Sequence, residues 1–223
     1  MHEEFLATTA LFENTTAEEV DAMLGCLGTR AKTYDAGEYI HHMDDCINSV
    51  GVVLEGSVRI ESVDVWGNVS VIGVRKPGQL FGEAQAAVPN EPLMVDVIAT
   101  TKCRIMFLEA AKVLSTCSHA CPNHRRASTN LTRLIARQNL ALSRRILHVA
   151  PKTIRGKVLA YLSDEAERAG SPEFDIPYDR QQLADYLGVD RSALSAELSR
   201  MTRDGVLRTN RSHFVLLDCD SDT

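Results

Sequence analysis

Hydrophobic spacing changes several times along the chain and predicts where helices give way to strands. Up to about residue 33, apolar positions recur at helical intervals, and Thr16 with Glu19 three positions on forms a capping box. From Tyr34 to about Leu108, short β-type runs alternate with glycine, proline and asparagine. Many short strands at this spacing predict an all-β sandwich or barrel. The predicted strands cover residues 50–54, 58–62, 69–74, 95–99 and 104–108, with turns at Gly56, Gly67–Asn68 and Pro77–Gly78.

One long helix is predicted after the strands and a short helix at 109–114. Residues 125–149 contain neither glycine nor proline, and apolar side chains recur on one face at Leu131, Ile135, Leu142 and Val149. A long amphipathic helix between two modules usually buries its apolar stripe against a domain or a second copy of the chain. We therefore expect the protein to form a parallel homodimer through this helix.

Two short helical patterns meet at Gly188 and predict a helix-turn-helix. Its apolar positions are Leu183, Ala184 and Leu187 before the glycine and Leu194, Leu198 and Met201 after it. Asp179 and Asp190 stand where N-caps of the two helices are needed. A short strand is expected before the motif at 174–178, and β-type runs at 206–208 and 213–217 predict a hairpin wing after it.

The outer face of the second helix carries polar groups that can hydrogen-bond phosphates and base edges. We therefore expect the second helix to enter the major groove of double-stranded DNA. The competing interpretation is that these are solvated side chains of an exposed helix. The candidate DNA-contacting residues are Arg180, Arg191, Ser192, Ser195, Ser199 and Arg200.

Composition agrees with a soluble globular protein, because 44% of the 223 residues are hydrophobic and 24% are charged. The acidic start predicts no secretion signal, and no apolar run is long enough for a membrane span. Six cysteines without such a signal are typical of a reducing compartment. We expect a cytoplasmic protein with no membrane partner.

The net charge of −6 at pH 7 is unevenly distributed along the chain. The segment from Ala110 to Ser163 contains no aspartate or glutamate but holds ten lysines and arginines. Such a segment is either a basic region that meets phosphates or the solvated face of a helix, and the sequence leaves both interpretations open.

A segment with Cys117, Cys121 and His124 lies just before the long helix. Thiols four residues apart with an imidazole three further on can share a helical face, as in a partial metal site or a redox pair. The alternative is that these are small residues packed at the start of the helix, and a closed zinc site would need a fourth ligand. We therefore predict no definite metal site and name no cofactor. No catalytic triad, phosphate-binding loop or suitable carboxylate pair is evident, so we expect no enzymatic activity.

The order of these modules resembles the cyclic-AMP receptor/fumarate-nitrate regulator (Crp/Fnr) family of bacterial transcription factors. The resemblance covers nearly the whole chain through the motifs Leu54–Val58, Pro77–Glu83, Arg180–Ala184 and Asp190–Ser195. It implies an α+β protein with a cyclic-nucleotide-binding-type β-roll (a jelly roll) at 1–116, a hinge and long dimerisation helix at 117–150, and a winged helix-turn-helix at 151–223. It also implies a pseudo-palindromic DNA site, allosteric control and RNA polymerase as a partner.

The resemblance assigns Arg191 to the position where cyclic-AMP-type members place an arginine on a guanine, a bidentate pairing that base geometry favours. Ser192 stands where many members have glutamate, and Ser195 where serine is common in the fumarate-nitrate branch. Ala196 departs from the family, because a contacting arginine often stands there. The half-site therefore cannot be copied from either branch.

The effector pocket departs further from the family. Cyclic-nucleotide members hold the phosphate with an Arg-Ser pair, and those two positions fall on Leu93 and Met94 here. The positions that meet the adenine fall near Leu140 and Ala141, which are also apolar. A phosphodiester buried there would lack a compensating charge, so cyclic AMP is not expected as the ligand. The predicted pocket accepts a different small molecule or none, and it is framed by Gly82, Glu83, Val95 and the long helix. Glu83 either contacts that ligand or only accepts backbone hydrogen bonds.

The sequence thus predicts a Crp/Fnr-type regulator that responds to an unknown small-molecule effector other than cyclic AMP. Two alternatives stay open. One is a thiol- or metal-based redox sensor on the same scaffold, with Cys117 and Cys121 as the sensing pair. The other is a small-molecule-binding module whose DNA binding is vestigial.

Overall fold

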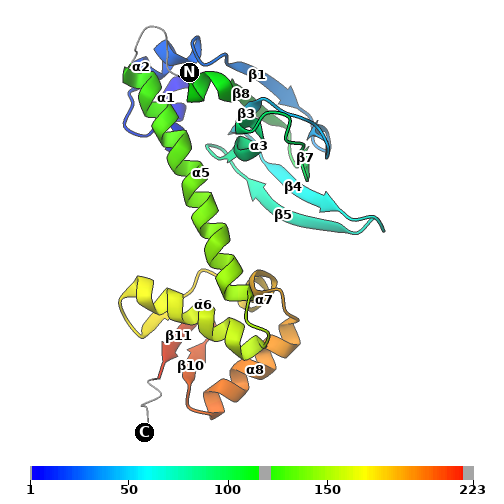
Figure 1. Ribbon diagram of the computed structural model, residues 1–223, viewed down its shortest axis with the longest axis vertical. Helices are drawn as coiled ribbons and strands as arrows, with labels where there is room; N and C mark the ends of the chain where they lie inside the picture. The colour runs from blue at the N-terminus through cyan, green and yellow to red at the C-terminus, as the bar shows by residue number, and fades with distance from the viewer. Residues whose placement is uncertain (1, 116–121, 218–223) are drawn as a thin grey trace. The chain divides into compact units, whose positions relative to one another are not determined.

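The computed structural model describes residues 2–115 and 122–217 (Figure 1). The chain divides into two compact units, Met1–Arg137 and Gln138–Thr223. Each unit has its own core, as expected for a chain of this length. The predicted α+β architecture of a β-roll, a long helix and a winged helix-turn-helix is confirmed.

The first unit begins with α1 (Glu3–Ala7), a 3₁₀ turn (Ala10–Phe12) and α2 (Ala17–Leu24). The capping box at the start of α2 is confirmed. The Thr16 hydroxyl accepts from the Glu19 amide at 3.2 Å, and the Glu19 carboxylate accepts from the Thr16 amide at 2.9 Å. Leu6, Phe12 and Met23 from these segments are buried in a common core with strands β3 and β8.

Two four-stranded antiparallel sheets form the β-roll. One has the order β1-β8-β3-β6, and the other has the order β2-β7-β4-β5. Buried side chains from both sheets, including Val53, Ile60 and Phe107, share one core between them. The strands are β1 (Arg30–Tyr34), β2 (Tyr39–His41), β3 (Ser49–Glu55), β4 (Val58–Val63), β5 (Val69–Arg75), β6 (Leu80–Phe81), β7 (Asp96–Ala99) and β8 (Cys103–Glu109). Two short helices, α3 (Glu83–Ala87) and α4 (Ala110–Leu114), complete the roll.

The prediction that helices extend to residue 33 was wrong. Residues 30–34 form strand β1, which pairs antiparallel with β8 from Arg30↔Phe107 to Tyr34↔Cys103. The first four residues of β1 are exposed, so no apolar alternation reveals the strand in the sequence. Hydrogen bonds to a partner strand about 70 positions away decide its conformation.

Helix α5 (Pro122–Val149) is the predicted long helix, and it belongs to both units. In the first unit, Leu131 is fully buried with Leu134 and Ile135 packed nearby. In the second half of the helix, the large side chains Leu140, Leu142, Ile146 and Leu147 are exposed in the single chain. None of the helices in the described part of the chain is long and apolar enough to cross a membrane.

The second unit is the winged helix-turn-helix. Helices α6 (Ile154–Ala169), α7 (Arg180–Leu187) and α8 (Arg191–Arg203) surround a core with Val158, Leu183 and Leu194 at its centre. The wing is an antiparallel sheet of order β10-β11-β9, with β9 at Glu173–Asp175, β10 at Leu207–Asn210 and β11 at His213–Leu216. The short strand before the motif is confirmed, although it ends at Asp175 rather than at residue 178.

Candidate nucleic-acid interface

Gly188 makes the sharp turn between α7 and α8. It has φ +63°, in the left-handed region that glycine enters without steric cost, and its amide bonds back to the last turn of α7. At the other end of α7, the Asp179 carboxylate accepts from the Gln182 amide, and the Gln182 side chain accepts from the Asp179 amide, at 2.8 and 2.9 Å. Both predicted signals for α7, the cap and the glycine, are confirmed.

Asp190 fixes where α8 begins. Its carboxylate accepts a hydrogen bond from the Ala193 amide at 2.8 Å and another from the Ser192 hydroxyl. The Ser192 hydrogen bond, followed by that from Ala193, holds the pKa of the Asp190 carboxyl below its usual value. Because the Ser192 hydroxyl donates to this carboxylate, Ser192 helps to stabilise the start of α8 in the free protein.

The two faces of α8 differ in burial. Leu194, Leu198 and Met201 are buried in the core of the unit, which leaves the opposite face outward. Arg191 is exposed on that outward face at the first turn. Among the residues that the structure describes, no ion pair or side-chain hydrogen bond engages its guanidinium. Its five donors are therefore free for an external acceptor.

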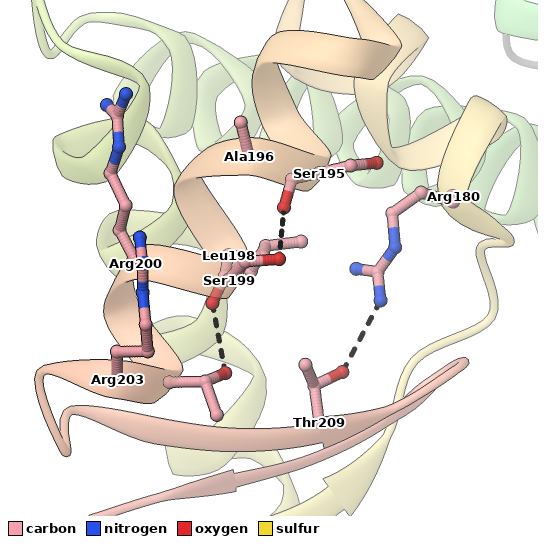
Figure 2. A pocket seen from close by; sticks show the side chains of 9 residues that line it. Arg180, Ser195, Ala196, Leu198, Ser199, Arg200, Arg203 and Thr209 are labelled. Carbon is pink, nitrogen blue, oxygen red and sulfur yellow. Dashed lines mark hydrogen bonds between the residues drawn. The ribbon is translucent and has the colours of Figure 1, made fainter.

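Ser195 and Ser199 bond back to their own helix. The Ser195 hydroxyl donates to the Arg191 carbonyl at 2.9 Å. The Ser199 hydroxyl donates to the Ser195 carbonyl, also at 2.9 Å (Figure 2). With their protons used in this way, the two hydroxyls present lone pairs outward as acceptors. Arg200 is exposed, and it pairs with Glu197 at 3.3 Å one turn earlier on the helix.

Arg180 connects α7 to the wing. Its guanidinium donates to the Arg211 carbonyl at 3.2 Å and to the Thr209 hydroxyl at 3.5 Å, and it lies 5.6 Å from the ring centre of Phe214. Partial burial lowers the pKa of Arg180, and the side chain keeps its charge in this position. The contacts in the free protein therefore give Arg180 a positioning role, whether or not it also meets DNA.

An open groove runs between α8 and the wing strand β10, with a volume of about 690 Å³. Figure 2 shows Arg180 facing Thr209 on one side of it and Arg200 with Arg203 on the other. A second groove of about 810 Å³ lies on the other side of Arg180 and includes Arg191 and Arg211. The two grooves bring five of the six predicted DNA-contacting residues to their rims: Arg180, Arg191, Ser195, Ser199 and Arg200.

Sequence reasoning missed further polar side chains at these grooves, among them Arg203, Thr209 and Arg211. Arg203 follows Ser199 by four positions on α8, so helical spacing could have found it. Arg211 lies in the turn of the wing with φ +54°, a conformation that the sequence does not predict for arginine.

Cations from the basic segment anchor the last turn of α7. Arg145 donates to the carbonyls of Tyr186 and Asp185 at 3.2 and 3.4 Å, and Lys157 donates to the Leu187 carbonyl at 3.1 Å. The Tyr186 and Leu187 carbonyls have no partner within α7, whereas the Asp185 carbonyl also accepts from the Gly188 amide at 3.3 Å. Cations at a helix C-terminus also interact favourably with the helix dipole. This part of the basic segment thus positions the helix-turn-helix through direct contacts.

Comparison with known proteins matches a known domain family in each half of the chain. A model of the cyclic nucleotide-binding domain matches residues 31–120, and a model of the Crp-like helix-turn-helix domain matches residues 156–221. The chain belongs to the Crp/Fnr family of transcription regulators. It is therefore a DNA-binding regulator of transcription, as the sequence predicted.

Relatives of this Crp/Fnr protein match over nearly its full length. It is 23% identical to the transcriptional activator protein anr of Pseudomonas aeruginosa, over 96% of this chain and 86% of the relative. It is 24% identical to the activator FnrA of Stutzerimonas stutzeri, over 90% of this chain and 82% of the relative. The Thermus thermophilus catabolite activator protein has a similar fold, with a TM-score of 0.52 at 22% identity over 94% of each chain.

The predicted effector pocket of this Crp/Fnr protein lacks a cation at the two positions named from the sequence. In the first unit, Leu93 is 2% exposed, its backbone pairs with Asp44 and Asp45, and Met94 is 68% exposed. Glu83 is 5% exposed at the start of α3, directly after Gly82, and no hydrogen bond from a described residue reaches its carboxylate. Val95 packs against the core of the roll. In the second unit, Leu140 and Ala141 are exposed in the single chain.

The candidate metal and redox segment lies mostly outside the described residues, which do not include Cys117 and Cys121. His124 is buried, and its Nε2 lies 2.6 Å from the Lys112 carbonyl oxygen. No group of three or more His, Cys, Asp or Glu within residues 2–115 and 122–217 could hold a metal ion. The interpretation of His124 as a packed residue therefore has direct contacts in its support.

Proposed function

We propose that this Crp/Fnr protein is a homodimer that reads a pseudo-palindromic DNA site through α8 and responds to an effector other than cyclic AMP. The observation that carries the proposal is Arg191, an exposed arginine without a described partner at the first turn of a capped helix. A guanine offers two acceptors, O6 and N7, at the spacing of a guanidinium fork. The bordering Ser192, Ser195 and Ser199 supply neutral groups for further base or phosphate contacts.

The exposed half of α5 supports the homodimer. Leu140, Leu142, Ile146 and Leu147 expose large apolar side chains in the single chain, although such side chains usually lie inside a protein. Leu142 and Ile146 share the face of the predicted apolar stripe. A second copy of the same helix packed along that face would remove them from water and hold two reading helices at a fixed separation. Half-sites about 34 Å apart, one turn of DNA, match such a pair. RNA polymerase is the expected partner of the DNA-bound dimer.

The absence of an arginine at Leu93 and Met94 supports an effector other than cyclic AMP. A buried phosphodiester without a compensating cation costs several kcal/mol. We expect cyclic AMP to leave DNA affinity unchanged. Native mass spectrometry of freshly purified protein would reveal a retained organic ligand, haem or metal by its added mass, and a complex with cyclic AMP in that spectrum would contradict this part of the proposal.

Selection of bound sequences from random DNA tests the reading function. The full chain should select a palindrome with half-sites one helical turn apart. At fixed salt concentration, Arg191→Ala should weaken binding to it by about 1–3 kcal/mol and relax the preference at one base pair in each half-site. Arg168→Ala is the matched control, because Arg168 pairs with Glu165 on α6 and lines neither groove. If wild-type protein selects no sequence, with or without cell extract as a source of effector, vestigial DNA binding is the better interpretation.

The redox alternative has its own test. If Cys117 and Cys121 form a sensing pair, the double variant Cys117→Ser, Cys121→Ser should lose any response of DNA binding to oxidant or chelator. An unchanged response in that variant would eliminate this alternative, and Cys103, which is buried, serves as the control thiol.

A further inference from the structure

A cavity in the second unit lies against three helices and shares Pro177 and Tyr178 with the second groove of the DNA-reading face. Its volume is about 450 Å³, within the range of small-molecule sites. The end of α5 contributes Arg144 and His148, α6 contributes Tyr161 and Asp164, and Tyr186 comes from α7. Tyr178, just before α7, completes the aromatic part of the lining.

Three tyrosines form a continuous aromatic wall in this cavity. The ring centres of Tyr178 and Tyr186 are 5.1 Å apart, and those of Tyr161 and Tyr186 are 5.3 Å apart. His148 packs edge-on against Tyr161 with ring centres 5.4 Å apart. The Arg145 guanidinium already lies 5.5 Å from the ring centre of Tyr186. An aromatic wall of this kind can also pack against a flat apolar ring.

One hydroxyl of this wall lacks a partner. Tyr161 is 2% exposed, and its buried hydroxyl has no hydrogen-bond partner among the described residues. The neighbouring hydroxyl of Tyr186, in contrast, lies 2.9 Å from His148 Nδ1. Burial raises the pKa of Tyr161, so its hydroxyl keeps its proton and remains a donor. A ligand in the cavity that brings an acceptor would satisfy it.

The charges around the cavity leave one cation unpaired. Arg168 pairs with Glu165 at 2.8 Å. Asp164 Oδ2 lies 3.6 Å from His148 Nε2, but this buried oxygen has no hydrogen-bond partner among the described residues. Arg144 is exposed, and within the described part of the chain it forms no ion pair or side-chain hydrogen bond. An anionic group is the natural partner of such a guanidinium.

We propose that this cavity is a second ligand site of the protein, and that it takes a small aromatic carboxylate. The ring lies against the tyrosine wall, and the carboxylate accepts hydrogen bonds from Arg144 and the Tyr161 hydroxyl. Because α5, α6 and α7 all line the cavity, the occupied site ties the end of the long helix to the first helix of the reading motif. The site does not depend on how the β-roll is controlled or on which DNA sequence α8 reads.

Ligand-observed NMR and calorimetry on the full chain test the site with benzoate as the probe. Benzoate should bind one site per chain with Kd of about 1 mM or tighter, as expected for so small a ligand. Benzyl alcohol, which keeps the ring but lacks the charge, should bind at least about tenfold more weakly. Absence of benzoate binding, or equal binding of the two compounds, would overturn the proposal.

Substitutions locate the site. Arg144→Gln should weaken benzoate binding about tenfold, and Tyr161→Phe should weaken it severalfold while keeping the aromatic wall. Arg137→Gln is the matched control, because Arg137 lies two turns earlier on α5, is exposed and does not line the cavity. Unchanged melting temperatures establish that the variants fold. Equal losses for Arg137→Gln and Arg144→Gln would mean that benzoate binds only through general positive charge, and the assignment of the cavity would be wrong.

Discussion

The reading unit and the β-roll differ in how their functional residues are distributed along the chain. The candidate contacts of α8 fall within thirteen consecutive residues, and two caps and one glycine fix the helix that carries them. The predicted pocket of the roll draws Gly82, Glu83 and Leu93 from separate segments between strands. A site on one helix can be deduced from local spacing, whereas a site assembled from loops depends on how distant segments meet.

The two units show what a sequence can indicate about DNA reading and about ligand recognition. On α8 the sequence contains Arg191, and its five hydrogen-bond donors predict contacts with acceptors on DNA. In the roll, Leu93 and Met94 lack the charge that a phosphate would need. Their apolar side chains argue against cyclic AMP but indicate no other ligand. Four experiments test this contrast.

Leu194→Ala should unfold the reading unit selectively. Leu194 is fully buried in the core of residues 138–223, so its truncation should cost about 2–5 kcal/mol of that unit's stability and abolish DNA binding. Denaturant unfolding followed by far-ultraviolet circular dichroism should show one transition moved to lower denaturant and a second one unchanged. Ser163→Ala, at an exposed position on α6 that lines neither groove, is the control. A single transition that moves as a whole would contradict independent units.

Arg211→Ala should separate phosphate contacts from base contacts. Arg211 lies in the turn of the wing and not on α8, so we expect it to meet the DNA backbone. Its removal should weaken binding to all sequences about equally and lower the slope of log K against log salt by about 1. The salt dependence of binding to the selected palindrome and to unrelated DNA measures both quantities. A loss confined to the palindrome would instead make Arg211 a base-reading residue.

Arg145→Gln should loosen α7 without touching any candidate DNA contact. The variant loses hydrogen bonds to the carbonyls of Tyr186 and Asp185, which together should lower the free energy of unfolding by about 0.5–1.5 kcal/mol. Hydrogen exchange of the α7 amides should be faster than in the wild type. Arg133→Gln, at an exposed position earlier on α5, should change neither quantity.

The Asp190 cap should give the smallest effect, and one that depends on pH. Hydrogen bonds lower the pKa of this carboxyl in the folded protein, so its stabilising contribution is present above the unfolded value near 3.8 and is lost as the pH falls through the folded value. The melting temperature of Asp190→Asn should therefore be lower than that of the wild type at pH 7. The two melting temperatures should converge below about pH 4. Removing the Ser192 hydroxyl by Ser192→Ala should move the pKa of Asp190 back toward 3.8, as NMR titration can measure. A difference in melting that persists at low pH would mean that the charge is not what stabilises the helix start.

Much of the fold could be predicted because its signals are local. The caps Thr16, Asp179 and Asp190 were found from side chains within three residues of the groups they bond. Strands β3 and β8 were found within about two residues of their ends because their apolar side chains are nearly continuous. Strand β4 was found because apolar Val58 and Ile60 alternate with polar Arg59 and Glu61. Strand β1 was missed because it is held at a sheet edge by β8 and carries no apolar pattern of its own.

The candidate site divides in the same way. Five of the predicted DNA contacts lie at the two grooves. The hydrogen bonds from Arg180 to Thr209 and Arg211 could not be predicted, because they join residues about thirty positions apart. The anchoring of α7 by Arg145 was hidden for the same reason. In the sequence Arg145 is one cation of a basic segment, and only the packing of α5 on α7 shows which acceptors it meets.

The sequence by itself determined the family, the order of modules and the helix that carries Arg191, because these depend on residue type and short-range spacing. The tertiary structure decided which polar groups are already engaged and which remain available. Ser192 is bound to Asp190 and Arg180 to the wing, whereas Arg191, Arg144 and the Tyr161 hydroxyl are left without described partners. The physical reason is that hydrogen bonding and burial are properties of atoms brought together in space, and most of these atoms come from distant parts of the chain.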